Sequence, residues 1–228
     1  YGYSAKDFKN LLDSLRLNMI SGHVSFGAND WDDAKKDFTD QWKYTVEDAR
    51  TAGQEFIITP EMDEQALKDY DTMMKLLELF NQCGSYCEKH GLQFGYHNDF
   101  GFMTTLHGKN VYDIILANTN PALVAQEFDI GNMYGAGGRP LQILKQHPGR
   151  FKLMHVKDEI KISGIGEMGN NYQSTILGKG LLPIKEIIDA AKKSGGTKYF
   201  IIEQESYQGK NPVECSKEDF LQMRKWGF

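Results

Sequence analysis

Charged side chains recur in pairs, two residues apart, at the points where short apolar runs of the sequence end. The pairs are His97 with Asp99, Glu127 with Asp129, His155 with Lys157, and Glu203 with Glu205. Residues two apart in a strand share one face, so each pair points to one side of its predicted strand. In a parallel α/β barrel the carboxyl ends of the strands meet at one mouth. We therefore expect the four pairs to line a single pocket.

Asp129, His155 and Glu203 are the strongest candidates for chemistry. Each follows an apolar run closely enough to be partly buried, and a buried charge is costly unless it is paired or coordinates a metal. Two carboxylates and an imidazole, without a thiolate, suit one divalent ion such as Mn²⁺, Mg²⁺, Co²⁺ or Zn²⁺. For Asp158 and Glu205 we favour an ordinary helix cap or a solvated loop position.

The composition limits the class of partner. The chain has 228 residues, of which 40% are hydrophobic and 25% charged, as in ordinary globular proteins. A net charge of -5 without a lysine or arginine cluster argues against nucleic acid. No apolar run is long enough to span a bilayer and no signal peptide is visible, which predicts a cytoplasmic or bacterial periplasmic protein. A small polar substrate is the expected ligand, and self-association is left open.

Strand and helix patterns alternate along the chain, as in a parallel α/β protein. No proline-rich or serine-rich linker divides them, which predicts a single domain over residues 1–228. The six predicted strands cover residues 17–24, 54–60, 92–98, 122–132, 151–158 and 198–205. The predicted helices cover residues 4–15, 33–53, 64–91, 109–118, 139–149 and 182–196.

Several of these segments together carry a resemblance to a known family. The run FGYHNDFGF (94–102), followed by QEFDIGN, LMHVKD, ILGKGLLPIKEII and YFIIEQE, resembles the sugar phosphate isomerase/epimerase superfamily, also called the xylose isomerase-like TIM barrel family. The resemblance covers nearly the whole chain. It implies a TIM-type (β/α)₈ barrel with one divalent metal at its mouth. Because only six strands are visible, we expect the first two β/α units of such a barrel to be missing from this chain.

The resemblance also implies roles for single residues. Asp129, His155 and Glu203 match three metal-ligand positions, and the fourth falls on the YHN segment, where we choose His97. Many relatives read YHNHxxEF here. In this chain the second histidine is absent and Gly101 replaces the glutamate. Asp99 or water are the alternatives for the fourth ligand.

For function, we predict a sugar isomerase or epimerase that works by metal-assisted proton transfer next to a sugar carbonyl. Glu203 is the predicted base, with Lys157 and His155 as further catalytic groups. A lyase or dehydratase acting on keto-sugars or 3-keto-glycosides is the alternative, since it needs one base and the same metal. A carbohydrate-binding protein without activity is a third hypothesis.

Four residues are predicted to contact the sugar. They are His23, Asn98, Glu127 and Trp31. For His23 a core histidine is an equal alternative, and for Trp31 an exposed loop aromatic.

Trp42 lies on an amphipathic pattern and is predicted to be core. For Lys157, an ion pair with Asp158 or Glu127 is expected in preference to a catalytic role.

Overall fold

The computed structural model describes residues 2–99 and 101–228, which form two compact units. Among the described residues, the first unit comprises 2–97 and 104–125, and the second comprises 98–99, 101–103 and 126–228. Among the described residues, no helix is long and apolar enough to cross a membrane.

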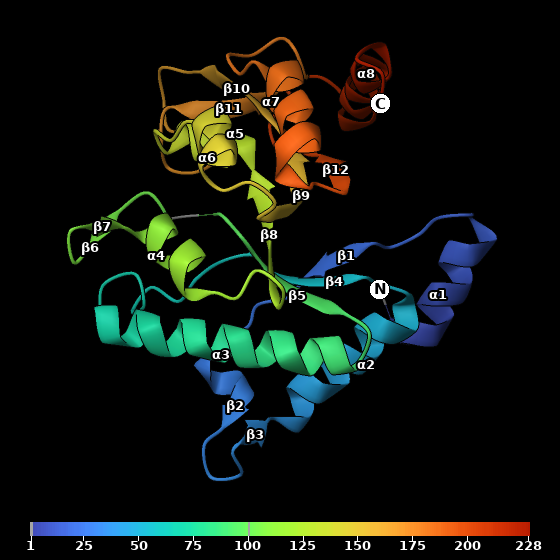
Figure 1. Ribbon diagram of the computed structural model, residues 1–228. Helices are drawn as coiled ribbons and strands as arrows, with labels where there is room; N and C mark the ends of the chain where they lie inside the picture. The colour runs from blue at the N-terminus through green and yellow to red at the C-terminus, as the bar shows by residue number, and fades with distance from the viewer. Residues whose placement is uncertain (1, 100) are drawn as a thin grey trace. The chain divides into compact units, whose positions relative to one another are not determined.

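Three parallel strands form the centre of the first unit. They are β1 (Ser21–His23), β4 (Phe56–Thr59) and β5 (Gln93–His97), and β4 pairs with both others. Figure 1 shows the long helix α3 running beside β5. The helices are α1 (Ala5–Ser14), α2 (Asp40–Ala52), α3 (Tyr70–Lys89) and α4 (Val111–Asn118), with a short 3-10 turn η1 (Ala28–Asp30). A small hairpin, β6 (Thr105–Leu106) and β7 (Lys109–Asn110), precedes α4.

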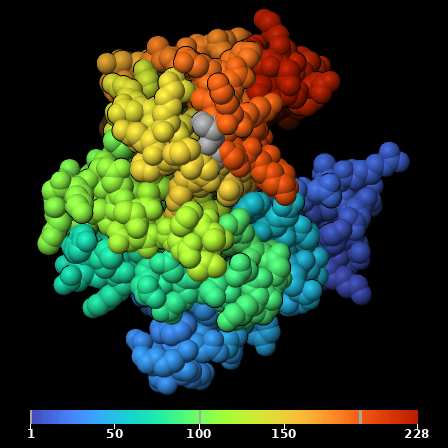
Figure 2. Space-filling view, viewed as in Figure 1, coloured from blue at the N-terminus to red at the C-terminus, as the bar shows by residue number. Residues whose placement is uncertain are grey.

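The helix predicted at 33–53 begins later than expected, at Asp40. Residues before it form a hairpin instead, made of β2 (Trp31–Asp32) and β3 (Asp37–Phe38). The hydroxyl of Thr39 accepts a hydrogen bond from the Trp42 amide and so caps the helix. The buried side of α2 includes Trp42, which is 1% exposed, and the prediction that Trp42 is core is confirmed. In Figure 2 the hairpin, in blue, projects beyond the green surface of α3.

The second unit also has three parallel strands at its centre. They are β8 (Val124–Asp129), of which Gln126–Asp129 belongs to this unit, β9 (Phe151–Val156) and β12 (Tyr199–Ile202). β9 pairs with both others. The helices are α5 (Ile130–Gly135), α6 (Pro140–Gln146), α7 (Ile184–Ala190), the π-helical turn η2 (Ala191–Gly195) and α8 (Pro212–Lys225). An antiparallel hairpin of β10 (Asp158–Lys161) and β11 (Tyr172–Thr175) follows β9.

All six predicted strands are present, although each is shorter than its apolar run. The run at 122–132 contains both β8 and the start of α5, because the side chain of Asp129 ends the strand by capping the helix. Neither the β10–β11 hairpin nor α8 was expected from the sequence. The assignment of residues 1–228 to one domain stays a prediction.

Candidate active site

Three of the predicted residues meet at the carboxyl ends of the strands in the second unit. Asp129 ends β8, His155 lies near the end of β9 opposite Asp129, and Glu203 directly follows β12. Each offers one ligand atom, and these atoms lie within 4.8 Å of one another. The parallel register brings together residues that are separated by many positions in the chain.

His155 is surrounded by carboxylates. Its Nδ1 contacts Glu203 Oε2 and lies 3.8 Å from Asp129 Oδ2, and its Nε2 lies 3.4 Å from Glu127 Oε2. Glu127 and Asp129 are fully buried. Burial lowers the pKa of this imidazole, but hydrogen bonds to Asp129, Glu127 and Glu203 outweigh it and raise the pKa to about 12. The carboxylates therefore stabilise a positive charge at this place.

The donor set fits a divalent metal ion. It combines one imidazole nitrogen with carboxylate oxygens and contains no thiolate, which suits Mn²⁺, Mg²⁺, Co²⁺ or Zn²⁺. The carboxylates stabilise the positive charge of a protonated His155. A divalent ion bound to the neutral imidazole would supply this positive charge instead. Asp129, His155 and Glu203 are thus the residues of this unit that would hold the ion.

Two asparagines hold Asp129 in place. Asn98 Nδ2 donates to the Asp129 carbonyl, and the Asp129 amide donates to Asn98 Oδ1, both at 2.9 Å. The backbone N–H of Asn132 donates to Asp129 Oδ1 at 2.8 Å. The other carboxylate oxygen, Oδ2, is directed at His155. Both ends of the Asn98 amide are bonded to backbone, so this side chain positions Asp129. Its predicted contact with the sugar stays a prediction, as does that of Glu127.

Lys157 is 1% exposed and lies beside the same cluster. Its ammonium contacts Glu205, donates to Asn132 Oδ1 at 3.1 Å, and lies 3.6 Å from Glu167 Oε2. Lys157 does form ion pairs, but the prediction that Asp158 or Glu127 would be the partner was wrong. Glu205, expected as a cap or solvated residue, is half-exposed and belongs to this network. Burial lowers the pKa of Lys157, but the surrounding carboxylates raise it above its usual value, so the ammonium stays charged.

Asp158 has a different role from the one that the sequence predicted. Its side chain is fully buried rather than solvated. It accepts hydrogen bonds from the amides of Gly178 and Gly180 at 2.9 and 3.0 Å, and from Leu182 at 3.1 Å. A Cβ on Gly180 would lie 2.2 Å from Asp158 Oδ1, so only glycine allows this approach. Asp158 anchors the turn before α7.

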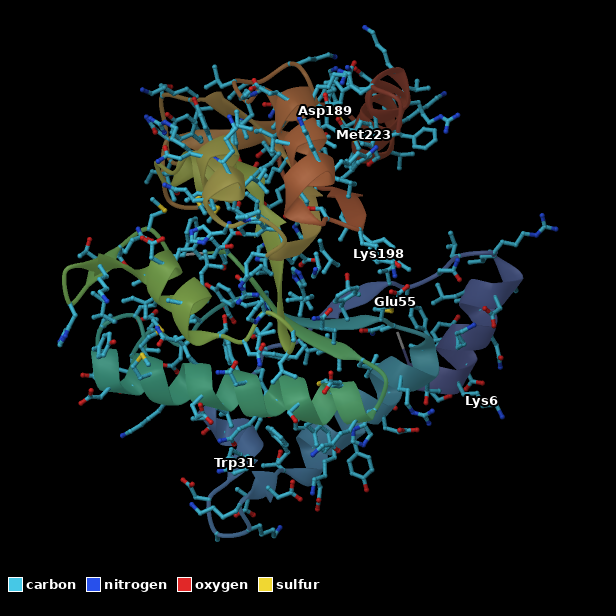
Figure 3. All side chains as sticks on the ribbon, viewed as in Figure 1. Lys6, Trp31, Glu55, Asp189, Lys198 and Met223 are labelled. Carbon is cyan, nitrogen blue, oxygen red and sulfur yellow. The ribbon has the colours of Figure 1, made fainter. Side chains whose placement is uncertain are left out.

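The remaining predicted residues lie in the first unit. His97 ends β5, and its Nδ1 donates to the Pro60 carbonyl at 3.2 Å, which fixes the orientation of the ring. His23 ends β1, with its ring 5.1 Å from that of His97. Trp31, labelled in Figure 3, begins a strand rather than lying in a loop. The centroid of its ring lies 5.1 Å from that of Phe38. The fourth-ligand role of His97 and the sugar contacts of His23 and Trp31 stay predictions.

Glu159 and Glu167 are acidic residues near Lys157 that the sequence reasoning missed. Glu159 is 3% exposed, and Glu167 accepts hydrogen bonds from the amide and the hydroxyl of Ser174. The two-residue alternation that pairs His155 with Lys157 continues to Glu159 and was the available signal. Glu167 lies in a glycine-rich loop, where no periodicity points to a site.

Comparison with known proteins identifies a family and curated relatives. The family model described as Xylose isomerase-like TIM barrel matches residues 1–226. An inosose dehydratase from Bacillus licheniformis is 29% identical over 150 residues, which cover 61% of this chain and 49% of that protein. The chain spans about half the length of the curated relatives it matches.

Solved structures share the fold at lower identity. A sugar phosphate isomerase/epimerase from Parabacteroides distasonis superposes with a TM-score of 0.76 at 22% identity, covering 98% of this chain and 82% of that chain. An IOLI protein with a bound zinc atom gives a TM-score of 0.70 at 14% identity, covering 99% and 82%. At these identities the likeness concerns the fold.

Proposed function

We propose that this chain, which belongs to the xylose isomerase-like TIM barrel family, is a metal-dependent lyase. The reaction would remove water, or another β-substituent, from a keto-sugar or a ring-shaped polyol that carries a ketone. The substrate is a small molecule of the inosose type, the class named for the curated relatives.

One observation carries the proposal. The cluster of Asp129, His155 and Glu203 lies directly beside the buried ammonium of Lys157, whose Nζ is 3.7 Å from Glu203 Oε1 and 3.9 Å from Asp129 Oδ2. A carboxylate base and a fixed cation at this distance are what proton abstraction next to a carbonyl requires.

Glu203 is the proposed base. Burial is the largest influence and raises its pKa, but the hydrogen bond to His155 and the charges of His155 and Lys157 together lower the pKa below its ordinary value, so the group is ionised at neutral pH. It would take the proton from the carbon next to the substrate carbonyl. Lys157 would orient the substrate and stabilise the negative charge that develops on oxygen. A divalent ion held by Asp129, His155 and Glu203 would supply a Lewis acid for the same charge.

Elimination fits this chain better than two-base epimerisation. In relatives that epimerise, a second glutamate follows the strand that carries His97, and this chain has Gly101 in that segment. Elimination needs one base only. The curated relatives named as dehydratases point to the same class.

The test is to incubate the protein with inosose and Mn²⁺ in deuterated water. We expect loss of water with deuterium exchange at the carbon next to the ketone, and loss of both after chelation of the metal. Dehydration that continues without the metal would refute the metal-dependent mechanism.

Isomerisation or epimerisation is the second candidate, favoured by the fold neighbours named sugar phosphate isomerase/epimerase. Deuterium incorporation into a ketose without loss of any substituent would establish it. Sugar binding without exchange or elimination would instead indicate a binding protein.

A further inference from the structure

Glu159 is a buried carboxylic acid that the proposed chemistry has not used. It lies in β10, opposite Ser174 of β11, and is 3% exposed. Within the described part of the chain, its Oε2 has no hydrogen-bond partner. Buried polar side-chain atoms are usually hydrogen-bonded, so the bare oxygen of Glu159, beside the Lys157 cluster, is available to a bound substrate.

The charges around Glu159 come from four elements. Lys157 at the end of β9 is the cation, and the carboxylates are Glu167 of the β10–β11 loop, Asp129 of β8 and Glu205 after β12. The ammonium of Lys157 is already shared, because it contacts Glu205 and lies 3.6 Å from Glu167 Oε2. One cation therefore serves several carboxylates, which disfavours a further negative charge on Glu159.

The protonation state of Glu159 follows from this environment. Burial raises its pKa first, Lys157 lowers it, and Glu167, Asp129 and Glu205 raise it again, to about 8. At neutral pH the side chain is a neutral acid that donates a hydrogen bond. A leaving hydroxyl group needs such a donor, because hydroxide is a poor leaving group.

We propose that Glu159 is the general acid of the elimination, whose carboxyl faces the hydroxyl that leaves. This inference rests on the proposed lyase function and adds a catalytic residue to it. Structural roles for buried carboxyls look different in this protein, since both oxygens of the adjacent Asp158 accept backbone amides.

Glu203 takes the proton from the carbon next to the carbonyl, and the electron pair of that C–H bond moves to the carbonyl oxygen, giving an enolate beside Lys157. The enolate electron pair then returns to form the new C=C bond and restore the carbonyl. The C–O bond at the neighbouring carbon breaks with its electron pair going to oxygen. The Glu159 proton transfers to this oxygen, so that water leaves and Glu159 becomes a carboxylate. Proton exchange with solvent then restores both carboxyl groups.

Glu159→Gln tests the proposal, with Glu214→Gln on the exposed start of α8 as the matched control. Glutamine keeps the shape and a hydrogen-bond donor but has no transferable proton. We expect inosose dehydration to fall about 100-fold or more. Deuterium exchange at the carbon next to the ketone should stay near the unmodified rate, because Glu203 is intact.

A substrate analogue separates acid catalysis from a structural role. Fluoride departs as a stable anion, so an inosose with fluorine in place of the leaving hydroxyl should eliminate at similar rates in Glu159→Gln and in the unmodified protein. Infrared spectroscopy at pH 7 should show a protonated-carboxyl band that Glu159→Gln lacks and Glu214→Gln keeps.

Dehydration by Glu159→Gln within about threefold of the unmodified rate would overturn the proposal, as would an unchanged protonated-carboxyl band or an equal loss of fluoride elimination. These outcomes leave the lyase function intact. Absence of both exchange and dehydration in the unmodified protein would refute the lyase function itself.

Discussion

Two neighbouring acids of β10, Asp158 and Glu159, are both buried, yet their surroundings differ. Asp158 accepts four backbone amides, three from the turn at residues 178–182 and one from Glu159 itself. Glu159 has a bare oxygen and adjoins the cluster of charges around Lys157. Adjacent residues of a strand point to opposite faces, so one acid faces the scaffold and the other the site. Burial alone therefore does not distinguish the two acids, whereas their hydrogen-bond partners do.

The pKa values follow the same division. Burial raises the pKa of both acids, but for Asp158 the amides of Leu182, Gly180, Gly178 and Glu159 act against it. For Glu159 only the charge of Lys157 lowers the pKa, and three carboxylates raise it further, in the same direction as burial. The scaffold acid is stabilised by fixed dipoles, whereas the site acid retains its proton.

The largest expected effect is on the site side, at Glu203. We expect Glu203→Gln to lower kcat for dehydration by about 10²–10⁴-fold, because the amide cannot accept the substrate proton. Steady-state kinetics with inosose measures this, and Glu186→Gln, on the exposed side of α7, is the control. Retained activity in Glu203→Gln would remove the base from the proposed site.

On the scaffold side, Asp158→Asn should act on stability. The asparagine side chain has one acceptor oxygen and no charge, whereas the carboxylate has two oxygens and a negative charge. The backbone N–H groups of the 178–182 turn would therefore lose a charged partner. The free energy of unfolding should fall by about 3 kcal/mol, as measured by urea titration. The fraction that stays folded should keep its kcat within about tenfold. A larger loss of kcat without a loss of stability would contradict the division between the two acids.

The pH dependence of stability should distinguish Glu159. Between its unfolded pKa of 4.5 and its folded pKa of about 8, the folded protein holds a proton that the unfolded chain has lost. Stability contributed by this group is therefore lost as pH rises through that window. From pH 5 to pH 9, Glu159→Gln should lose less free energy of unfolding than the unmodified protein, by on the order of 2 kcal/mol. Parallel curves for the two proteins would contradict the raised pKa.

The smallest effect is expected at Lys179, in the turn that Asp158 holds. Its ammonium lies 2.6 Å from Glu218 Oε2, and both side chains are about half exposed. Lys179→Gln should change the free energy of unfolding by less than about 1 kcal/mol, because solvent screens such pairs. Urea titration beside Asp158→Asn tests this. A loss as large as that of Asp158→Asn would mean that the turn depends on its surface ion pair.

Much of the fold and part of the site could be predicted from the sequence. The apolar runs located all six strands, and the resemblance to the xylose isomerase-like TIM barrel family is confirmed. Asp129, His155 and Glu203 were selected as strand-end residues and do lie together. These successes share a cause: strand burial and side-chain alternation are local properties that leave a regular pattern in the sequence.

The sequence alone shows which residue types end the strands and therefore which donors the candidate site can offer. The partners of these side chains could be read only from the three-dimensional structure. Lys157 pairs with Glu205 and Glu167 rather than with Asp158 or Glu127, and Asp158 turns away to the amides of residues 178–182. These contacts join residues that lie 10 to 48 positions apart. Strand register and loop closure set such distances, and neither leaves a periodic signal in the chain.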